Sequence, residues 1–419
     1  MAAHVHVVGA GLAGLAAAVA LVRRGMAVSL HEAAGHAGGR CRSYRDRRLD
    51  REIDNGNHLI LSGNAALLDH LQAIGAGGGL REIAPARFGF RDLASGASWH
   101  LAPGETRYWA LKPGTLPPGI GAAGLIADVL RLATAGAADD IGARLDVDGI
   151  RFRRLWGPLA VAALNTEAKT ASARGLWAVV RETLLRGEAA SRPLLADRGL
   201  SHALIDPAVD WLRRHAMDVR LNARLRRLVD DGDRVTGLDF ADGTLALGPR
   251  DAVLLALPPW GAEALLSWLP PTRTYSAILN AHFVLPPGAP GLAPELPFVG
   301  LLGGIAEWLF QRGDVLSVTV SAANRFAGET EETLAAGLWR DVARTLALPE
   351  TPVPPCRLIV EKRATPAQTP AWEATRPGPR TRLANLVLAG DWTDTGLPAT
   401  LEGAVRSGRR AAALLAGGE

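Results

Sequence analysis

The sequence predicts an α/β protein whose first domain is a parallel sheet covered by helices. A β-branched run at residues 4–8 precedes a glycine-rich turn, and residues 15–24 then carry small and apolar side chains at helical spacing. Gly25 ends this helix, and a second apolar run follows at residues 27–31. Strand, helix and strand at these short separations are typical of a βαβ unit, because two parallel strands need a crossover connection.

Length and composition fit a globular protein of more than one domain. The chain has 419 residues, of which 48% are hydrophobic and 21% charged, so two domains with buried cores are expected. The net charge of +4 is too small to predict a nucleic-acid partner. Two cysteines and ten histidines without metal-ligand spacing predict neither a disulfide framework nor a metal site. No apolar run reaches 18 residues and no signal-peptide pattern opens the sequence, so a cytoplasmic location is expected.

The turn after the first strand has the glycine pattern of a dinucleotide-binding loop. It reads Gly9-Ala10-Gly11-Leu12-Ala13-Gly14. Gly9 is expected to permit the tight turn, Gly11 to let the backbone approach a diphosphate, and Gly14 to let the helix pack closely on the sheet. The N–H groups at the helix start hold the phosphates, aided by the helix dipole. Glu32 ends the second strand, where its carboxylate can accept hydrogen bonds from a ribose.

A second glycine pair indicates which dinucleotide is bound. Gly38, Gly39 and Arg40 lie just beyond the second strand, six residues after Glu32. Here the sequence resembles the superfamily of amine oxidases and phytoene desaturases, in which a Gly-Gly-Arg segment at this distance continues the diphosphate and ribityl contacts of FAD. The resemblance implies FAD as the cofactor, with Arg40 supplying positive charge.

The last forty residues hold the closing motif of the same superfamily. A buried-type strand at residues 386–389 ends in Gly390 and Asp391, and a Gly/Ala-rich helix follows. The resemblance implies that Asp391 bonds the ribityl chain or bridges to phosphate. It also implies that backbone N–H groups near Leu401 face the C2 carbonyl of the flavin. Glu402, in the first helical turn, is either a partner of the helix dipole or a cofactor contact, and both interpretations stay open.

Short strands in the middle of the chain resemble the β-meander and return strand of these flavoproteins. They are expected at residues 219–221, 225–229, 235–240, 244–247 and 253–257. The resemblance implies that backbone near Leu225 contacts the adenine. The Rossmann-like FAD-binding domain is therefore discontinuous, and it comprises residues 1–85, 195–260 and 355–419. A mixed α+β substrate-binding domain is expected from residues 86–194 and 261–354.

Three sequence segments narrow the resemblance to one family. They are Asp54-Asn55-Gly56-Asn57-His58-Leu59 with Leu61-Ser62-Gly63-Asn64, Ala364-Thr365-Pro366-Ala367-Gln368-Thr369-Pro370, and residues 389–404 from Ala-Gly-Asp-Trp to Glu-Gly-Ala. These resemble the hydroxysqualene dehydroxylases, also called squalene-associated FAD-dependent desaturases. The family implies the reduction of hydroxysqualene to squalene in a squalene or hopanoid pathway, and the resemblance places Asn57 at the cofactor. Pro366 and Leu401 depart from the family pattern, which has Phe and Ile there.

Loss of a hydroxyl group needs an acid, because hydroxide is a poor leaving group. Asp54, His58 and Asp394 are the candidate acids, and all three are expected in loops near the flavin. His58 has the most suitable unperturbed pKa. Structural interpretations stay open beside these: His58 as a hydrogen-bonding residue within its turn, and Asp394 as a cap before the final helix.

A C30 hydrocarbon substrate must come from a bilayer and return to it. The segment 120–135 has apolar residues at helical spacing, and residues 150–164 bring three arginines and a tryptophan ahead of an apolar run. Either an interfacial helix or core packing of the substrate domain accounts for this pattern. Peripheral association with the inner membrane is expected, as is an upstream partner resembling squalene synthase.

Other functions are compatible with parts of the sequence. A phytoene-type desaturase would share the FAD motifs, but the phrase at residues 389–404 argues against it. An amine oxidase would need an aromatic cage and a flavin-side lysine, for which three tyrosines and three lysines offer little material. A flavin-free prenyl-binding escort protein would not need the intact glycine and acidic motifs.

Overall fold

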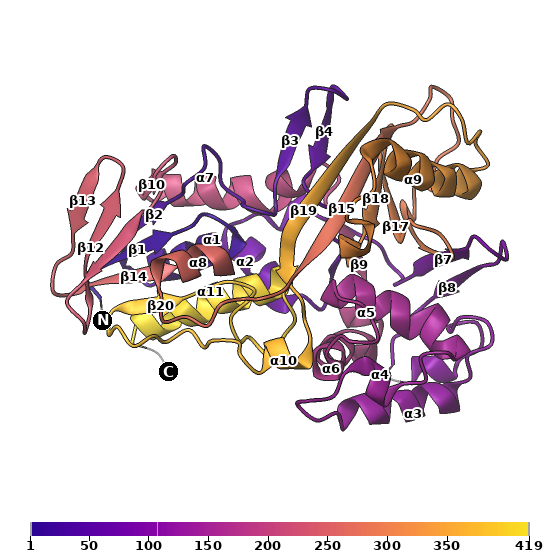
Figure 1. The fold of residues 1–419 in the computed structure, drawn as a ribbon, viewed down its shortest axis with the longest axis horizontal. Helices are drawn as coiled ribbons and strands as arrows, with labels where there is room; N and C mark the ends of the chain where they lie inside the picture. Colours follow the sequence, from indigo (N-terminus) through magenta and orange to yellow (C-terminus); the bar gives the residue numbers. More distant parts are fainter. Residues whose placement is uncertain (1, 107, 418–419) are drawn as a thin grey trace.

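The first domain is built on a parallel sheet of five strands. The computed structural model describes residues 2–106 and 108–417, and the strand order in this sheet is β10-β2-β1-β14-β20, with every neighbouring pair parallel (Figure 1). The strands are β1 His4–Val8, β2 Ala27–His31, β10 Asp218–Arg220, β14 Asp251–Leu255 and β20 Leu386–Leu388. Strands from the start, middle and end of the chain therefore form one sheet, which confirms the discontinuous α/β fold.

Helices from the start, middle and end of the chain cover one face of this sheet. They are α1 Leu12–Val22, α2 Ala65–Ala73, α7 Asp206–Arg214 and α11 Leu401–Leu415, and they share an apolar core with Val5 and Val7 of β1. α1 begins at Leu12, three residues earlier than expected, because the end of the glycine-rich turn is already helical. α11 lies so close to α1 that a Cβ at Gly408 would stand 2.1 Å from the carbonyl oxygen of Ala13. The first and last motifs are thus held side by side.

The other face of the parallel sheet packs against a three-stranded antiparallel meander and a short helix. These are β11 Arg227–Asp230, β12 Val235–Phe240, β13 Gly243–Ala246 and α8 Pro259–Leu265. The meander was expected, but β10 belongs to the parallel sheet and pairs with β2.

A second sheet of seven strands forms the other half of the molecule. Its order is β19-β15-β18-β17-β16-β7-β8, and only the pair β16–β7 is parallel. The strands are β7 Phe88–Asp92, β8 Ser98–Leu101, β15 Tyr275–Val284, β16 Phe298–Leu302, β17 Trp308–Arg312, β18 Val315–Val320 and β19 Cys356–Pro366, and α9 Glu331–Leu346 covers one face. β19 corrects the expected domain boundary at residue 355. It pairs with β15 along most of its length, so the last flavin-domain segment begins after Pro366.

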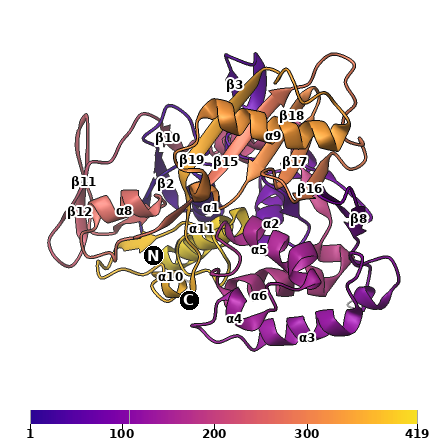
Figure 2. The same ribbon diagram turned by 45° about the vertical axis from the view of Figure 1, so that its right-hand side comes forward.

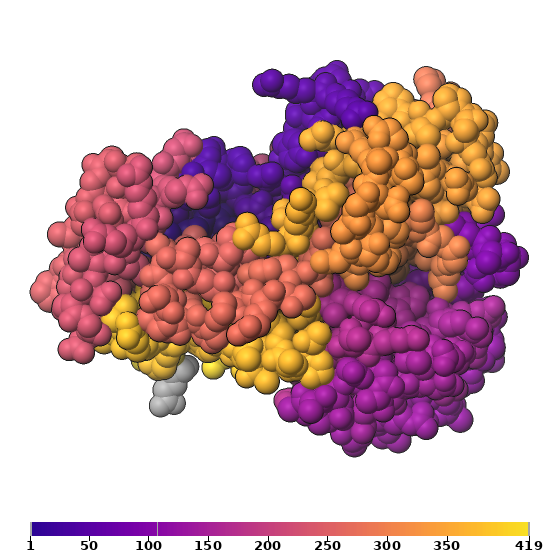
Figure 3. Space-filling model, in the orientation of Figure 1, coloured from indigo at the N-terminus to yellow at the C-terminus, as the bar shows by residue number. Residues whose placement is uncertain are grey.

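A helical lobe lies beneath this second sheet (Figure 2). It contains α3 Ala122–Ala133, α4 Ile141–Arg144, the π-helix η3 Phe152–Trp156, α5 Gly157–Leu164 and α6 Ala173–Glu182. One apolar cluster joins these helices to Phe88, Phe90 and Phe298 of the sheet, which confirms a mixed α+β second domain. In the space-filling view the lobe is the purple mass at the lower right, directly under the orange strands (Figure 3).

Short elements connect these units. They are the hairpin β3 Ser43–Asp46 and β4 Arg51–Asp54, the small sheet of β5 Ile60–Leu61, β6 Arg81–Glu82 and β9 Pro193–Leu195, the helix α10 Pro370–Glu373, the π-helix η6 Ser201–Ile205, and the 3-10 turns η1 Gly77–Gly79, η2 Trp109–Leu111, η4 Leu184–Arg186, η5 Glu188–Ala190 and η7 Ala323–Phe326. Within the described ranges, none of the helices has the length and apolar character needed to cross a bilayer.

Candidate functional site

The glycine-rich loop between β1 and α1 has the shape of a diphosphate cradle. Gly9 has φ +103°, and a Cβ there would stand 2.5 Å from the carbonyl oxygen of Ala256. A Cβ at Gly14 would stand 1.9 Å from the carbonyl oxygen of Gly9, so only glycine lets the helix start this close to the strand. A Cβ at Gly11 would meet nothing within 4 Å. The surroundings of Gly9 and Gly14 therefore require glycine, as predicted, whereas the phosphate role of Gly11 stays a prediction.

No side chain caps the start of α1. Gly11 is the N-cap residue, and it offers no side-chain acceptor to the first-turn N–H groups. These groups and the positive end of the helix dipole are suited to a phosphate anion. The loop thus fits a dinucleotide diphosphate at the backbone of Leu12 and Ala13.

Glu32 holds the loop and retains capacity for a ribose. One carboxylate oxygen accepts a hydrogen bond from the N–H of Ala10 and the other from the N–H of Ala34, both at 2.8 Å. A carboxylate has about four lone-pair sites, so two remain for hydroxyl groups. The backbone before Leu225 lies beside it, since the N–H of Ala223 donates to the Glu32 carbonyl at 2.7 Å.

The two remaining flavin motifs meet at a partly buried ion pair. The Gly38 N–H donates to the Ala10 carbonyl at 2.8 Å, which places the Gly38-Gly39 turn directly against the diphosphate loop. From that turn the Arg40 guanidinium reaches Asp391 at 2.6 Å and also donates to the carbonyl of Ala364. Burial opposes the charge of Arg40, but the Asp391 carboxylate raises its pKa further above the usual range.

Gly390 is required next to this pair. Its φ is +146°, and a Cβ there would stand 2.4 Å from the indole nitrogen of Trp392. That nitrogen donates to the carbonyl of Leu257 at 2.9 Å, which fixes the loop against the end of β14. Gly390 therefore allows the chain to turn so that Asp391 points back toward Arg40.

His58 lies at the junction of the two sheets. Its side chain is half-buried, and burial lowers its pKa from the usual 6.5, with the Asp54 carboxylate opposing this shift and the Arg40 guanidinium adding to it. His58 lies within electrostatic range of Arg40 and of Asp391, whose carboxylate also opposes the lowering of its pKa.

The loop that carries His58 is anchored to the seven-stranded sheet. The Asn57 side-chain N–H donates to the Thr319 hydroxyl at 2.9 Å, and this hydroxyl donates to Asn280 at 2.9 Å. The Asn280 amide in turn donates to the carbonyl of Asn55 at 3.3 Å. One amide N–H of Asn57 is thus used by the sheet, and its contact with the cofactor stays a prediction.

The other two candidate acids have different surroundings. Asp54 ends β4 instead of lying in a loop, and its carboxylate accepts from Ser43, from the N–H of Leu200 and from Arg312 at 2.7 Å. Asp394 is exposed, and its carboxylate accepts from the N–H of Gly396 at 3.2 Å. These contacts favour structural roles for both residues.

The Glu402 carboxylate caps a helix other than its own, and its contact with the cofactor stays a prediction. It accepts from the N–H groups of Ala66 and Leu67 at 3.0 and 2.9 Å, at the start of α2, and it pairs with Arg406 at 2.8 Å. Both oxygens are thus used by the protein. Thr400 caps α11 itself through the N–H of Gly403, and the helix start at Leu401 stands where the flavin motif predicts it.

Two polar residues that sequence reasoning missed hold the C-terminal motif. Gln368 is fully buried, and its side chain joins the carbonyl of Leu164 to the N–H of Ala399, both at 2.8 Å. Arg376 donates to the carbonyls of Asp391 and Leu397 at 3.0 and 2.6 Å. Gln368 belongs to one of the sequence segments that carried the family resemblance, whereas no sequence signal marked Arg376.

Cys41, next to the Gly-Gly-Arg turn, is buried. Burial raises the pKa of its thiol to about 12. Because the thiolate is the nucleophilic form, this cysteine is not suited to a covalent link with a flavin.

Comparison with known proteins agrees with this site. The family model of flavin containing amine oxidoreductases matches residues 143–416, and the model of the NAD(P)-binding Rossmann-like domain matches residues 7–73. The chain is 45% identical to hydroxysqualene dehydroxylase of Rhodopseudomonas palustris over 99% of both chains. It is 43% identical to that of Sinorhizobium fredii, covering 99% of this chain and 98% of the other.

A solved structure shows the same fold. Cyclohexylamine oxidase from Brevibacterium oxydans superimposes with a TM-score of 0.70, covering 100% of this chain and 99% of the other, at 16% sequence identity. The diphosphate loop is intact, and the Arg40–Asp391 ion pair joins the first and last flavin motifs. Both features agree with the similarity to flavin enzymes. The chain belongs to the hydroxysqualene dehydroxylase family of flavin containing amine oxidoreductases, and it is an FAD-dependent oxidoreductase.

Proposed function

We propose that this enzyme reduces hydroxysqualene to squalene. The observation that carries the proposal is the likeness, over the whole chain, to enzymes named for that dehydroxylation. The site supports it, because Arg40 of the Gly-Gly-Arg turn pairs with Asp391 of the closing motif, and His58 lies within electrostatic range of both.

The reaction exchanges a carbon–oxygen bond for a carbon–hydrogen bond. The hydroxyl oxygen takes up a proton and leaves as water, and the allylic carbon gains a hydride. Reduced FAD supplies this hydride when bound, so a cellular reductant must reduce it again. The chain's own residues must then deliver the proton and keep the site dry.

His58 is the proposed proton donor. Asp54 is occupied by Ser43, Leu200 and Arg312, and Asp394 is exposed, so neither offers a proton in an enclosed site. The His58 imidazole is half-buried within electrostatic range of Arg40 and Asp391, in a loop that the Asn57–Thr319 hydrogen bond holds. Its position suits protonation of an alcohol held over the flavin site.

Apolar side chains next to His58 provide a dry surface for the hydrocarbon. Leu59 and Leu61 follow it in the chain and pack with Trp308 and Phe310 against the core of the helical lobe. Aromatic faces also attract positive charge, which suits an allylic carbon that loses hydroxide. We further propose peripheral contact with the inner membrane and supply by an enzyme resembling squalene synthase.

The direction of the reaction tests this proposal. Purified holoenzyme is reduced without oxygen and given hydroxysqualene, and in parallel the oxidised enzyme is given squalene or phytoene. We expect squalene from the first mixture and no new double bonds in the second. Desaturated products from the oxidised enzyme, with no squalene from the reduced one, would identify a desaturase instead.

A further inference from the structure

Large exposed hydrophobic side chains are concentrated in one short stretch of the chain. Among the residues that the structure describes, five large apolar side chains are exposed: Tyr108 57%, Leu111 60%, Ile126 50%, Leu130 60% and Val360 48%. Four of these lie between residues 108 and 130, in the turn η2 and the helix α3. Such clustering is unusual on a protein surface that faces only water.

Helix α3 exposes an apolar face. The exposed residues Ala123, Ile126, Leu130 and Ala133 have the three- and four-residue spacing of one helical face, and Arg131 is exposed beside them. Leu125 and Leu132 are buried on the inner face. The single carboxylate of the helix, Asp128, faces inward and is 2% exposed. A helix at a water surface carries its charged residues on the outside, whereas α3 presents an apolar face.

The inward carboxylate is fully neutralised by the protein. Asp128 accepts from Arg151 at 2.6 Å, from the Trp156 indole N–H at 3.0 Å and from Arg131 at 3.0 Å. This arrangement keeps negative charge away from the outer face. The residues 106–138 contain no other acidic side chain.

The cations of this stretch remain at its surface. Lys112 is exposed, and the side chain of Arg131 is 52% exposed although it touches Asp128. Long basic side chains bordering an apolar patch can reach anionic headgroups while their stems stay in apolar surroundings. The charge of the patch therefore complements a negatively charged surface.

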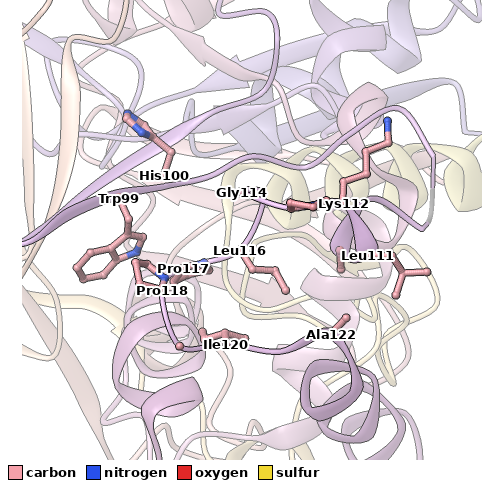
Figure 4. A pocket seen from close by; sticks show the side chains of 13 residues that line it. Trp99, His100, Leu111, Lys112, Gly114, Leu116, Pro117, Pro118, Ile120 and Ala122 are labelled. Atoms are coloured by element: carbon pink, nitrogen blue, oxygen red, sulfur yellow. The ribbon is translucent and has the colours of Figure 1, made fainter.

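An open groove adjoins the patch. It has a volume of about 620 Å³ and runs between β8 and the loop before α3 (Figure 4). Trp99, Leu111, Leu116 and Ile120 line it, and Figure 4 shows the Lys112 side chain extending from the loop at its rim. The groove adjoins Leu111 of the patch, and its lining also includes the polar side chains of His100 and Lys112.

We propose that Tyr108, Leu111, Ile126 and Leu130 form the surface by which this enzyme docks on an anionic lipid bilayer. The inference rests on the proposed function for its purpose, because a C30 substrate resides in lipid, but its evidence is the exposed apolar face of α3 and the basic rim. α3 lies along the outer edge of the helical lobe in both ribbon views, where a flat surface can approach it (Figures 1 and 2). The helix rests in the headgroup region without crossing the membrane.

Vesicle binding by the holoenzyme tests the docking surface. Vesicles of phosphatidylglycerol and phosphatidylethanolamine are compared with vesicles of phosphatidylcholine, in low and high salt. The double variant I126E/L130E is compared with V360E, which places the same charge on an exposed apolar residue outside the patch. Both variants are checked for bound flavin and melting temperature.

We expect tight binding to the anionic vesicles that weakens in high salt. I126E/L130E should bind at least ~30-fold more weakly, because burying each apolar side chain in the bilayer strengthens partitioning into the membrane roughly tenfold. V360E should bind like the parent. The proposal is overturned if the parent does not bind anionic vesicles or if I126E/L130E binds them as well as the parent. It is also overturned if V360E loses as much vesicle affinity as I126E/L130E. It is also overturned if the parent is a dimer that I126E/L130E separates, because the patch would then cover a second copy.

Turnover of detergent-dispersed hydroxysqualene separates this inference from the proposed function. With detergent, I126E/L130E should make squalene as fast as the parent, and with vesicle-borne substrate it should be slower. A parent that binds vesicles but makes no squalene in detergent would contradict the proposed function alone.

Discussion

Arg40 and Asp391 form an ion pair at 2.6 Å although 351 residues separate them in the chain. Asp391 is buried and follows the strand β20, whereas Arg40 follows the Gly-Gly turn that packs on the diphosphate loop. The pair thus fastens the closing flavin motif to the opening one. This contact explains why a domain assembled from distant segments can present a single cofactor site.

Asp391→Ala should weaken FAD binding about 10- to 100-fold, because one charge-assisted contact is lost and Arg40 is left without its partner. Titration of the apoenzyme with FAD measures the dissociation constant. Arg45→Ala is the matched control, since Arg45 pairs with Asp50 at the same 2.6 Å on the exposed surface, where ion pairs contribute little. An unchanged dissociation constant in Asp391→Ala would show that the pair does not organise the site.

Glu402→Ala should destabilise the fold without changing FAD affinity. The carboxylate accepts two N–H groups at the start of α2 and pairs with Arg406, so its removal should lower the free energy of unfolding by about 1–3 kcal/mol. Urea unfolding measures this loss, and Glu402→Gln should recover part of it. A large loss of FAD affinity with normal stability would instead restore the cofactor role that the sequence left open.

Arg376→Lys should loosen the loop between β20 and α11. Its guanidinium donates to the carbonyls of Asp391 and Leu397 at 3.0 and 2.6 Å, and a lysine cannot reproduce this fork. We expect a loss of about 3 kcal/mol in the free energy of unfolding of the holoenzyme, since bonds from a charged donor are the stronger kind. Arg382→Lys, at an exposed arginine above Trp268, is the control, and equal effects in both variants would contradict the positioning role.

The local patterns of the sequence predicted the flavin half well. β1, β2 and β12 have the expected bounds, and the environments of Gly9 and Gly14 agree with their assigned roles. These features depend on residues close together in the chain, where periodicity and glycine spacing act directly.

Long-range contacts account for what the sequence did not predict. β19 was assigned to the flavin domain, because nothing within its own residues indicates that it pairs with β15. Glu402 caps a helix whose start is 335 residues away, and Asp54 is held by Arg312, 258 residues along the chain. Local patterns do not encode such partners, so the catalytic candidates could be narrowed only with the structure.

His58 gives a prediction about pH. Its pKa is lowered by burial, so the neutral imidazole predominates at pH 7 and the protonated fraction grows as pH falls toward the lowered pKa. If His58 is the proton donor, the single-turnover rate should therefore rise as pH falls from 8 to 6.

The variant His58→Ala should be slower by about 10²–10⁴-fold and should lose this pH dependence while keeping its flavin. His215→Ala, at an exposed histidine, should behave like the parent. If His58→Ala loses flavin or stability but turns over normally once loaded with FAD, His58 is structural.

The central claim, that the assembled flavin site reduces an allylic alcohol, is tested most directly by a single turnover. Enzyme with fully reduced FAD is mixed without oxygen or other reductant with excess hydroxysqualene, and flavin absorbance and squalene are followed together. We predict one squalene formed for each flavin oxidised, with the same time course. Flavin that stays reduced while the alcohol remains intact would contradict the account.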